Sequence, residues 1–198
     1  MRLLKGIDCT VRGLLRAIDV TIAVARAVVV LSATLAGLSV VAAVVAYVKR
    51  ELMRTLDASV EIAAPPERVW ELISDLPAYA RWNPFIVRAG GELAVGGRLH
   101  ITIAAPGHRP VTFRPTVLEL EPGQSVTWLG RTLLPGLFDG HHTLSVTATE
   151  GGARFRTSEE VSGILVPLLG GIMRDSQRGF ELMAAAVKAR AEGRGGGT

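Results

Sequence analysis

The residue types best suited to chemistry in this sequence are one histidine and one glutamate, each in a run of alternating polar and apolar residues. His142 belongs to the run HHTLSVTAT, where strand alternation would place it on the face of Leu144 and leave His141 on the threonine face. Glu159 would share a strand face with Phe155 in the same way. With both side chains pointing inward, an imidazole and a carboxylate could work together as an acid and a base.

The histidine also has plainer interpretations. An inward His142 can be a core histidine that a neighbour satisfies by a hydrogen bond, and it can contact the polar headgroup of a ligand. The sequence shows no His, Cys and Asp spacing typical of a metal site, no phosphate-binding glycine loop, and no Gly-x-Ser-x-Gly motif. We therefore predict no metal and no cofactor, and His142 and Glu159 remain the only, weak, catalytic candidates.

Large apolar side chains provide candidates for ligand contact. Trp82 and Phe85 flank Pro84, and Trp128 alternates with Val126 on an apolar strand face. Methionine side chains on a helix facing these strands suit an adaptable apolar pocket, although plain core packing explains them too. The predicted ligand-binding set comprises Trp82, Phe85, Trp128, His142, Met173, Phe180 and Met183.

These candidates lie in a region, residues 58–192, that alternates short strands with turns and ends in a long helix. A strand is expected at Ser59–Ala63, a helix after Pro65-Pro66, and a second short helix capped by Asp75. Turn residues then separate strand-like runs at 85–88, 98–104, 111–120, 125–131, 138–149 and 153–161. Pro115 within one run predicts an edge position or a bulge. The long helix is expected from about Ile164 to Ala191.

The N-terminal quarter of the chain has a different character. Residues 27–48 carry no charge over 22 positions, and Arg26, Lys49 and Arg50 bound them. A helix of that length spans roughly 30 Å, which matches the hydrocarbon core of a bilayer. We predict a single transmembrane helix here; a cleaved signal peptide and the buried helix of a soluble domain are the alternatives.

The segments around this helix complete the predicted organisation. Residues 1–26 form a basic amphipathic lead, which we expect at the membrane interface; packing against a partner protein or against the globular domain is the alternative. Residues 49–57 are predicted as a linker and 193–198 as a disordered tail. The chain is thus expected to be a single-pass membrane protein, and the positive charges flanking the span are too evenly matched to assign the side on which the domain lies.

Charge is distributed unevenly between the two regions. Residues 1–50 hold seven Lys or Arg against two Asp or Glu, whereas residues 51–198 carry a net charge of −1. The basic character therefore belongs to the anchor region, and the domain has no positive excess that would favour nucleic acid. The single cysteine, Cys9, permits no internal disulfide.

Three motifs in the domain resemble a known superfamily. They are IAAPPERVWELISDLPAYARWNP at 62–84, DGHH at 139–142 and TSEEVSGILVPLLGG at 157–171. They resemble the SRPBCC superfamily, which includes START domains and polyketide cyclase/dehydrase-like proteins. The resemblance implies an α+β helix-grip fold, in which a curved antiparallel sheet of about seven strands wraps around the long C-terminal helix and encloses a cavity for a hydrophobic ligand.

The resemblance leaves three functions open. The first is binding or transfer of a lipid or other hydrophobic small molecule by a domain that the anchor holds at the membrane. The second is a cyclase or dehydratase that uses His142 and Glu159. The third is a non-catalytic module that binds a protein partner, whose identity the sequence does not indicate. We favour the first.

Overall fold

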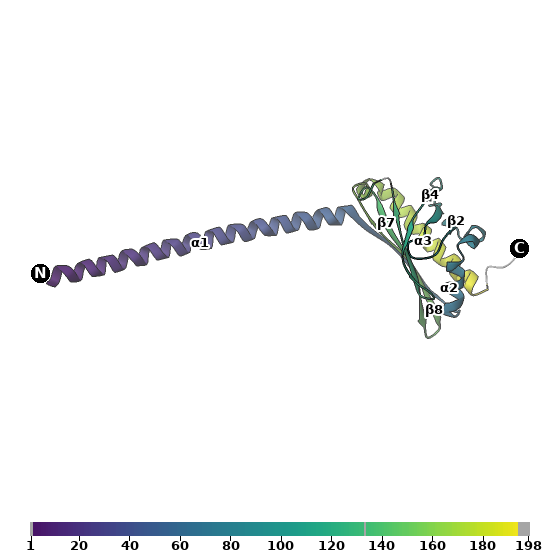
Figure 1. Ribbon diagram of the computed structural model, residues 1–198, viewed down its shortest axis with the longest axis horizontal. Helices are drawn as coiled ribbons and strands as arrows, with labels where there is room; N and C mark the ends of the chain where they lie inside the picture. The colour runs from purple at the N-terminus through teal and green to yellow at the C-terminus, as the bar shows by residue number, and fades with distance from the viewer. Residues whose placement is uncertain (1, 133, 194–198) are drawn as a thin grey trace. The chain divides into compact units, whose positions relative to one another are not determined.

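The computed structural model describes residues 2–132 and 134–193, and the chain divides into two units between Lys49 and Arg50 (Figure 1). The first unit lies within helix α1, Arg2–Leu52. The second contains all of the strands and the remaining helices. Of the predicted segments, the side chains of the lead up to residue 23 and most of the C-terminal tail, residues 194–198, lie outside the described residues.

Helix α1 contains a segment, Val24–Leu52, that is long and apolar enough to cross a membrane. The serine and threonine hydroxyls of this segment bond to carbonyls of the same helix: the hydroxyl of Ser32 donates to Val28 at 2.8 Å, and that of Ser39 donates to Leu35 at 2.9 Å. This pairing matters because a bilayer core offers no water to an unpaired polar group. The predicted span at 27–48 therefore falls inside one continuous helix.

The predicted linker at 49–57 is not a linker in the structure. Helix α1 continues to Leu52, and strand β1, Met53–Ile62, follows without a break. Residues 53–57 are therefore already part of the sheet, where they pair with the end of strand β8. The strand begins six residues before Ser59, but its first three residues, Met53 to Thr55, are all exposed. Alternating burial starts only at Leu56, so the first part of the strand has no pattern by which the sequence could reveal it.

The second unit is built on two antiparallel sheets. The larger has the order β1-β8-β7-β6-β5, with bounds Met53–Ile62, Gly152–Ser162, Asp139–Thr149, Ser125–Arg131 and Thr116–Glu121. The smaller has the order β2-β3-β4, with bounds Ile86–Gly91, Leu99–Ile103 and Val111–Phe113. Short turns join most neighbouring strands, as the Gly and Pro signals indicate.

Pro115 marks the point where the chain leaves one sheet for the other. The run predicted as one strand at 111–120 is two strands, β4 and β5, because proline cannot donate a ladder hydrogen bond. The Pro115 carbonyl instead accepts from the amide of Leu99 at 2.9 Å, and Arg98 forms an isolated bridge with Thr116. These bonds join the two sheets into one curved surface of eight strands, one more than predicted.

Four helical segments complete the second unit. They are α2, Pro66–Ser74; the 3₁₀ helix η1, Leu76–Arg81; the 3₁₀ turn η2, Val166–Leu169; and α3, Gly170–Ala191. Asp75 caps η1 as predicted, since its Oδ1 accepts from the amide of Ala78 at 3.3 Å. The long helix starts at Gly170, later than expected, because a 3₁₀ turn around Pro167 precedes it.

Helix α3 packs across the concave face of the strands (Figure 1). Phe180, Met183 and Val187 on this helix are fully buried, as are Phe155 and Leu144 on the sheet. The predicted fold class is confirmed: a curved antiparallel sheet wraps around a long C-terminal helix, and an apolar helix precedes this domain in the sequence. This arrangement leaves the inner faces of the strands and one side of α3 available to line a cavity.

Candidate functional site

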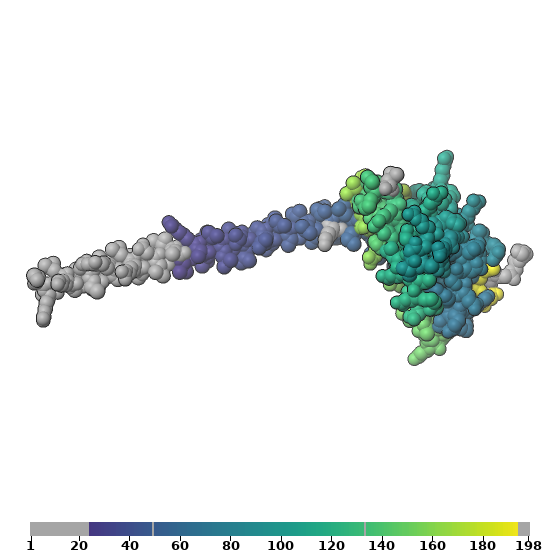
Figure 2. Space-filling model, in the orientation of Figure 1, coloured from purple at the N-terminus to yellow at the C-terminus, as the bar shows by residue number. Residues whose placement is uncertain are grey.

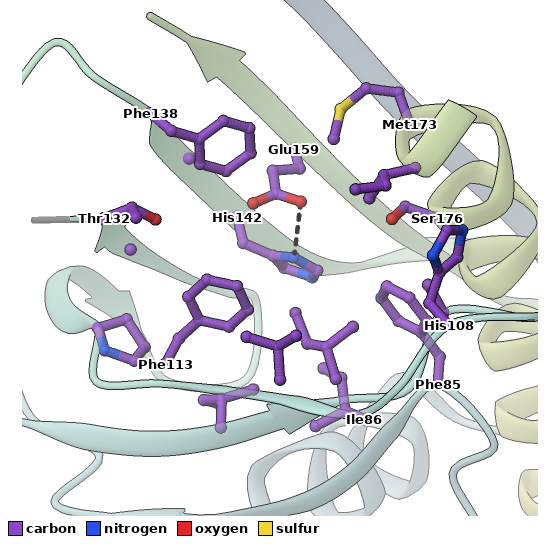
Figure 3. Close-up of a pocket in the computed structure, with 18 of the residues that line it drawn as sticks. Phe85, Ile86, His108, Phe113, Thr132, Phe138, His142, Glu159, Met173 and Ser176 are labelled. Carbon is purple, nitrogen blue, oxygen red and sulfur yellow. Dashed lines mark ion pairs between the residues drawn. The ribbon is translucent and has the colours of Figure 1, made fainter. Parts of the chain in front are cut away.

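A cavity of about 230 Å³ lies between the curved strands and the first turns of α3 (Figure 3). Most of its wall is apolar, and includes Phe85, Ile86, Ile101, Ile103, Phe113, Trp128, Phe138 and Met173. The polar side chains at the cavity are fewer: His108, Arg109, Thr132, His142, Glu159 and Ser176. An apolar wall with a few convergent polar groups is the usual composition of a small-molecule site.

His142 projects into this cavity from strand β7 and is 2 % exposed. Its ring stacks on Trp128 with 4.8 Å between centroids and lies 5.0 Å from the ring of Phe180. Its Nε2 is hydrogen-bonded to Thr157 Oγ1 at 3.1 Å. Burial among these groups disfavours the charged imidazolium and lowers the pKa of His142 to about 3. At neutral pH this histidine is therefore uncharged.

Glu159 lies opposite His142 on the neighbouring strand β8, since the two residues are register partners. Its Oε2 is 3.9 Å from His142 Nδ1, which is too long for a hydrogen bond (Figure 3). The side chain is only 18 % exposed, and no described residue donates a hydrogen bond to the carboxylate. Burial raises the pKa of Glu159 to about 7, so the carboxyl group is partly protonated at neutral pH.

Gly140 creates the space that this carboxylate occupies. A Cβ built at Gly140 would collide with Glu159 Oε1 and lie 3.6 Å from a methyl group of Val161. By contrast, a Cβ at the adjacent Gly130 would meet nothing nearer than the Gly140 carbonyl oxygen at 4.0 Å. The glycine in the DGHH motif thus has a steric role that the sequence alone does not reveal.

The arrangement can hold and move a proton. When the Nε2–H of His142 donates to Thr157, Nδ1 presents a lone pair toward Glu159. Glu159 can then present either a proton or a negative charge to a bound molecule at pH values near neutrality. The pair itself is therefore nearly neutral, which suits an uncharged hydroxyl or carbonyl group of a ligand at this point of the cavity.

A second histidine–carboxylate pair borders the same cavity. His108 lies in the loop between β3 and β4, and its Nε2 is 2.8 Å from Asp175 Oδ2 on helix α3. Both side chains are well exposed, at 38 % and 46 %. Because this loop also contributes Ala105 and Arg109 to the cavity wall, the pair fastens one edge of the cavity to the helix.

The structure brings together five of the residues singled out from the sequence. Phe85, Trp128, His142, Glu159 and Met173 all line the cavity. The inward orientation expected for His142 and Glu159 matches their positions here.

The other three residues proposed for ligand contact do not line the cavity. Trp82 packs on Tyr79 with 4.9 Å between ring centroids, away from the cavity. Phe180 lies behind His142 and Phe85, with which it makes ring contacts, and Met183 is fully buried in the core. On the same stripe of helix α3, Phe180 and Met183 lie about two and three turns beyond Met173, where the helix faces the packed core instead of the cavity.

Sequence reasoning missed much of the remaining wall. Ile101 and Ile103 lie in the run predicted as a strand at 98–104, but the sequence did not indicate that they line a cavity. Phe113, Phe138, His108 and Arg109 stand in short strands or loops without a periodic pattern, so they gave no comparable signal. Among residues 2–132 and 134–193, no cluster of three or more His, Cys, Asp or Glu could hold a metal ion.

Residues 53–193 match the family model described as polyketide cyclase/dehydrase and lipid transport. The chain belongs to this family. The match covers the whole second unit except its first three residues and the last five of the chain, and it begins where β1 begins. No curated protein sequence matches the chain. The predicted resemblance to START-like and polyketide cyclase/dehydrase-like proteins is confirmed.

Solved structures show the same fold at low sequence identity. The aromatase/cyclase Zhui from Streptomyces sp. R1128 is 19 % identical with a TM-score of 0.58, over 72 % of this chain and 95 % of that one. A START superfamily protein from Mycobacterium smegmatis is 20 % identical with a TM-score of 0.56, over 70 % and 97 %. The di-domain aromatase/cyclase StfQ of the steffimycin biosynthetic pathway is 16 % identical with a TM-score of 0.58, over 74 % of this chain.

This chain spans only about half of StfQ, 53 % of its length. At these identities the similarities establish the fold of the polyketide cyclase/dehydrase and lipid transport family and nothing finer. Family membership and the cavity together support a domain that binds a hydrophobic small molecule.

Proposed function

We propose that the second unit of this protein binds a lipid or another hydrophobic small molecule in the cavity between the sheets and α3, and that helix α1 anchors it in a membrane. The observation that supports the binding role best is the cavity itself, with an apolar wall and a nearly neutral polar pair, His142 and Glu159. An apolar ligand would be held mainly by removal of its surface from water, at roughly 25 cal/mol per Å².

The size of the cavity favours a compact ligand. Its volume of about 230 Å³ is a little below the roughly 300–1,000 Å³ usual for ligand pockets. A small ring system, or one end of a longer lipid, fits this space better than a complete acyl lipid. A single hydroxyl or carbonyl group on that ligand would find its partner at Glu159 or His142.

Gly130 offers a direct test, because it lines the cavity and a side chain there meets no close neighbour. We expect a Gly130→Leu variant to fill the cavity while the protein stays folded. Saturation with the two-ring aromatic probe 1-naphthol at 100 times its Kd should stabilise the full chain by about 2.7 kcal/mol, and the variant should lose this stabilisation. Thermal unfolding in lipid nanodiscs measures both.

Gly151→Leu is the matched control, since Gly151 lies in an exposed turn with open space around it. This variant should respond to the probe as the unmodified protein does. The cavity is not the binding site if Gly130→Leu keeps the full stabilisation by 1-naphthol.

Membrane anchoring is supported by the length and apolar surface of Val24–Leu52. The full chain should remain in the membrane pellet after extraction with alkaline carbonate, which releases peripheral proteins. Replacing Val30, Leu38 and Val44, all exposed on the helix, with arginine should move the protein to the supernatant. Release of the unmodified protein by carbonate would contradict an integral anchor.

A second candidate function is catalysis of a cyclase or dehydratase type. It is favoured by a specific observation, the 3.9 Å approach of Glu159 Oε2 to His142 Nδ1 beside an apolar cavity. If Glu159 transfers a proton, Glu159→Gln should leave probe binding intact and abolish turnover of a polyketide-like substrate. Turnover that survives this substitution would exclude Glu159 as the acid or base.

A further inference from the structure

We propose that one end of the second unit is a membrane-docking surface that inserts into the interface of a bilayer containing anionic lipid. This docking surface consists of Leu134, Ile164 and Leu168. The proposal rests on the proposed function in two respects, the anchoring of helix α1 in a membrane and the route by which ligand enters the cavity. The residues of the docking surface are different from those of the binding site.

The docking surface is exposed and apolar. Leu134 is 68 % exposed, Ile164 is 62 % exposed and Leu168 is 79 % exposed, and prolines 135 and 167 beside them are exposed as well. The two segments that contribute these residues, 132–138 and 163–173, contain no charged residue. Exposed apolar residues that are clustered rather than scattered mark an interaction site on a protein surface.

Backbone hydrogen bonds hold these two segments together. The amide of Ile164 donates to the carbonyl of Gly136 at 3.1 Å, and that of Leu165 donates to Leu137 at 3.2 Å. Figure 2 shows the green segment before β7 and the yellow-green segment before α3 side by side at one end of the unit. The exposed leucines and isoleucine therefore form one surface.

The identity of the partner follows from where the chain enters this unit. The amide of Gly163, next to Ile164, donates to the carbonyl of Leu52 at 3.0 Å. Leu52 lies four positions after Val48, the end of the predicted span, and four steps of chain can reach at most about 14 Å. Whatever direction α1 takes, the docking surface must therefore lie close to the point where the chain leaves the membrane.

The charges around this end favour an anionic membrane. Arg54 is paired with Glu51 at 3.6 Å, and Arg131 is paired with Asp139 at 3.7 Å. Among the described residues, Arg50 and the exposed Arg174 make no such pair. Basic residues beside an apolar surface are what a protein needs to bind acidic headgroups while inserting its apolar side chains.

The docking surface is continuous with the cavity. Ile172, one turn after Leu168 on the same charge-free segment, is 39 % exposed and also lines the cavity. Thr132 and Phe138, at the two ends of the other segment, line it too (Figure 3). A surface that inserts roughly 5–10 Å into the headgroup region would let a hydrophobic ligand pass from the bilayer to the cavity without crossing bulk water.

Depth-dependent fluorescence quenching tests the docking. In a Cys9→Ser background, Leu168→Cys and Ile164→Cys are each labelled with an environment-sensitive fluorophore, and the full chain is reconstituted in vesicles of phosphatidylcholine and phosphatidylglycerol. Glu150→Cys is the control, because Glu150 lies at the opposite end of β7, about 30 Å from the docking surface.

We expect blue-shifted emission and strong quenching by brominated lipids at positions 168 and 164, and neither at position 150. Omitting phosphatidylglycerol should weaken the quenching. Water-like emission at all three positions would overturn the proposal, and so would blue-shifted emission without lipid quenching, which would mean that a second copy or another protein covers the surface. The vesicles contain no ligand, so failure here leaves the test of the cavity with 1-naphthol unaffected.

Discussion

Two histidine–carboxylate pairs border the same cavity, and they differ in almost every physical respect. His108 and Asp175 lie 2.8 Å apart and are well exposed, whereas His142 and Glu159 lie 3.9 Å apart and are largely buried. The shorter contact is the weaker candidate for function. Water screens an exposed pair, so it contributes little, whereas burial shifts the pKa values of His142 and Glu159 in the direction of the uncharged forms.

Desolvation, rather than distance, therefore distinguishes the buried pair, which can take part in chemistry, from the exposed pair, which is a surface contact. The buried pair is uncharged at mildly acidic pH because the pKa of His142 is lowered while that of Glu159 is raised. The substitutions below change a residue of one pair or a neighbour of the buried pair, and they test whether burial causes the difference between the two pairs.

The largest effect is expected from Phe180→Ala. The ring of Phe180 is fully buried, packs 5.0 Å from that of His142 and makes an edge contact with Phe85. Its loss should lower the free energy of unfolding by about 3–5 kcal/mol. If water enters the space, the pKa of His142 should rise from about 3 toward its ordinary value.

Chemical denaturation and NMR titration of the His142 ring measure these two effects. Leu182→Ala, at a position on the same helix that is 43 % exposed, is the control and should cost well under 1 kcal/mol. His142 could still titrate near pH 3 in a destabilised Phe180→Ala protein in which water reaches its ring. That result would show that burial is not the cause of the lowered pKa of His142.

The second effect concerns the pH dependence of stability. Because the folded-state pKa of Glu159, about 7, exceeds the ordinary value of 4.5, the folded protein holds this proton more tightly than the unfolded chain does. The contribution of Glu159 to stability is therefore fully present below pH 4.5 and is lost as pH rises through 7. Glu159→Gln should abolish this loss.

Denaturation curves for the two proteins across this pH range provide the measurement. Relative to the unmodified protein, Glu159→Gln should gain a few kcal/mol between the acidic and the alkaline limit. The low pKa of His142 makes stability rise between pH 3 and 6.5, and this component should persist in the variant. Parallel curves for the two proteins would mean that Glu159 titrates normally.

A smaller effect is expected from Gly140→Ala, which crowds the Glu159 carboxylate without changing either partner of the buried pair. We expect a loss of about 1–3 kcal/mol and an altered pKa of Glu159, both from the forced shift of its side chain. Gly130→Ala is the matched control, because its new methyl group has room. Equal losses in the two alanine variants would argue against a steric role specific to Gly140.

The smallest effect is expected from Asp175→Asn at the exposed pair. Neutralising this carboxylate should change stability by less than about 1 kcal/mol, because solvent screens the contact with His108. The loop between β3 and β4 should nevertheless exchange its amide hydrogens faster, since it loses a tie to α3. A decrease of several kcal/mol in the free energy of unfolding would contradict the proposed difference between the two pairs.

These two pairs also show how far the sequence could predict the site. Strand alternation placed His142 and Glu159 on inner faces, because a period of two depends only on local geometry. The His108–Asp175 pair joins a loop to a helix 67 positions later in the sequence, and no local pattern indicates such a contact. The same limit applies to the space made by Gly140, since its neighbour Glu159 comes from another strand.

The fold, like the site, was predictable where local patterns decide it and not where contacts between distant residues do. The apolar run at 27–48 and the final helix were predicted from composition and periodicity, and the succession of strands along the chain was predicted from turn signals. The supposed linker at 49–57 and the single strand at 111–120 were wrong in detail. In both cases hydrogen bonds between distant strands determine the structure. Strand β1 pairs with β8, and the Pro115 carbonyl accepts from the amide of Leu99.

The most direct test of the account is mass spectrometry of organic extracts from the purified full chain, with Gly130→Leu and Gly151→Leu prepared in parallel. We expect a hydrophobic small molecule in stoichiometric amount in the unmodified protein and in Gly151→Leu, and its absence from Gly130→Leu. A compound retained equally by Gly130→Leu, or a folded protein that carries nothing when isolated from its native membrane, would contradict the proposal that this cavity is a ligand site.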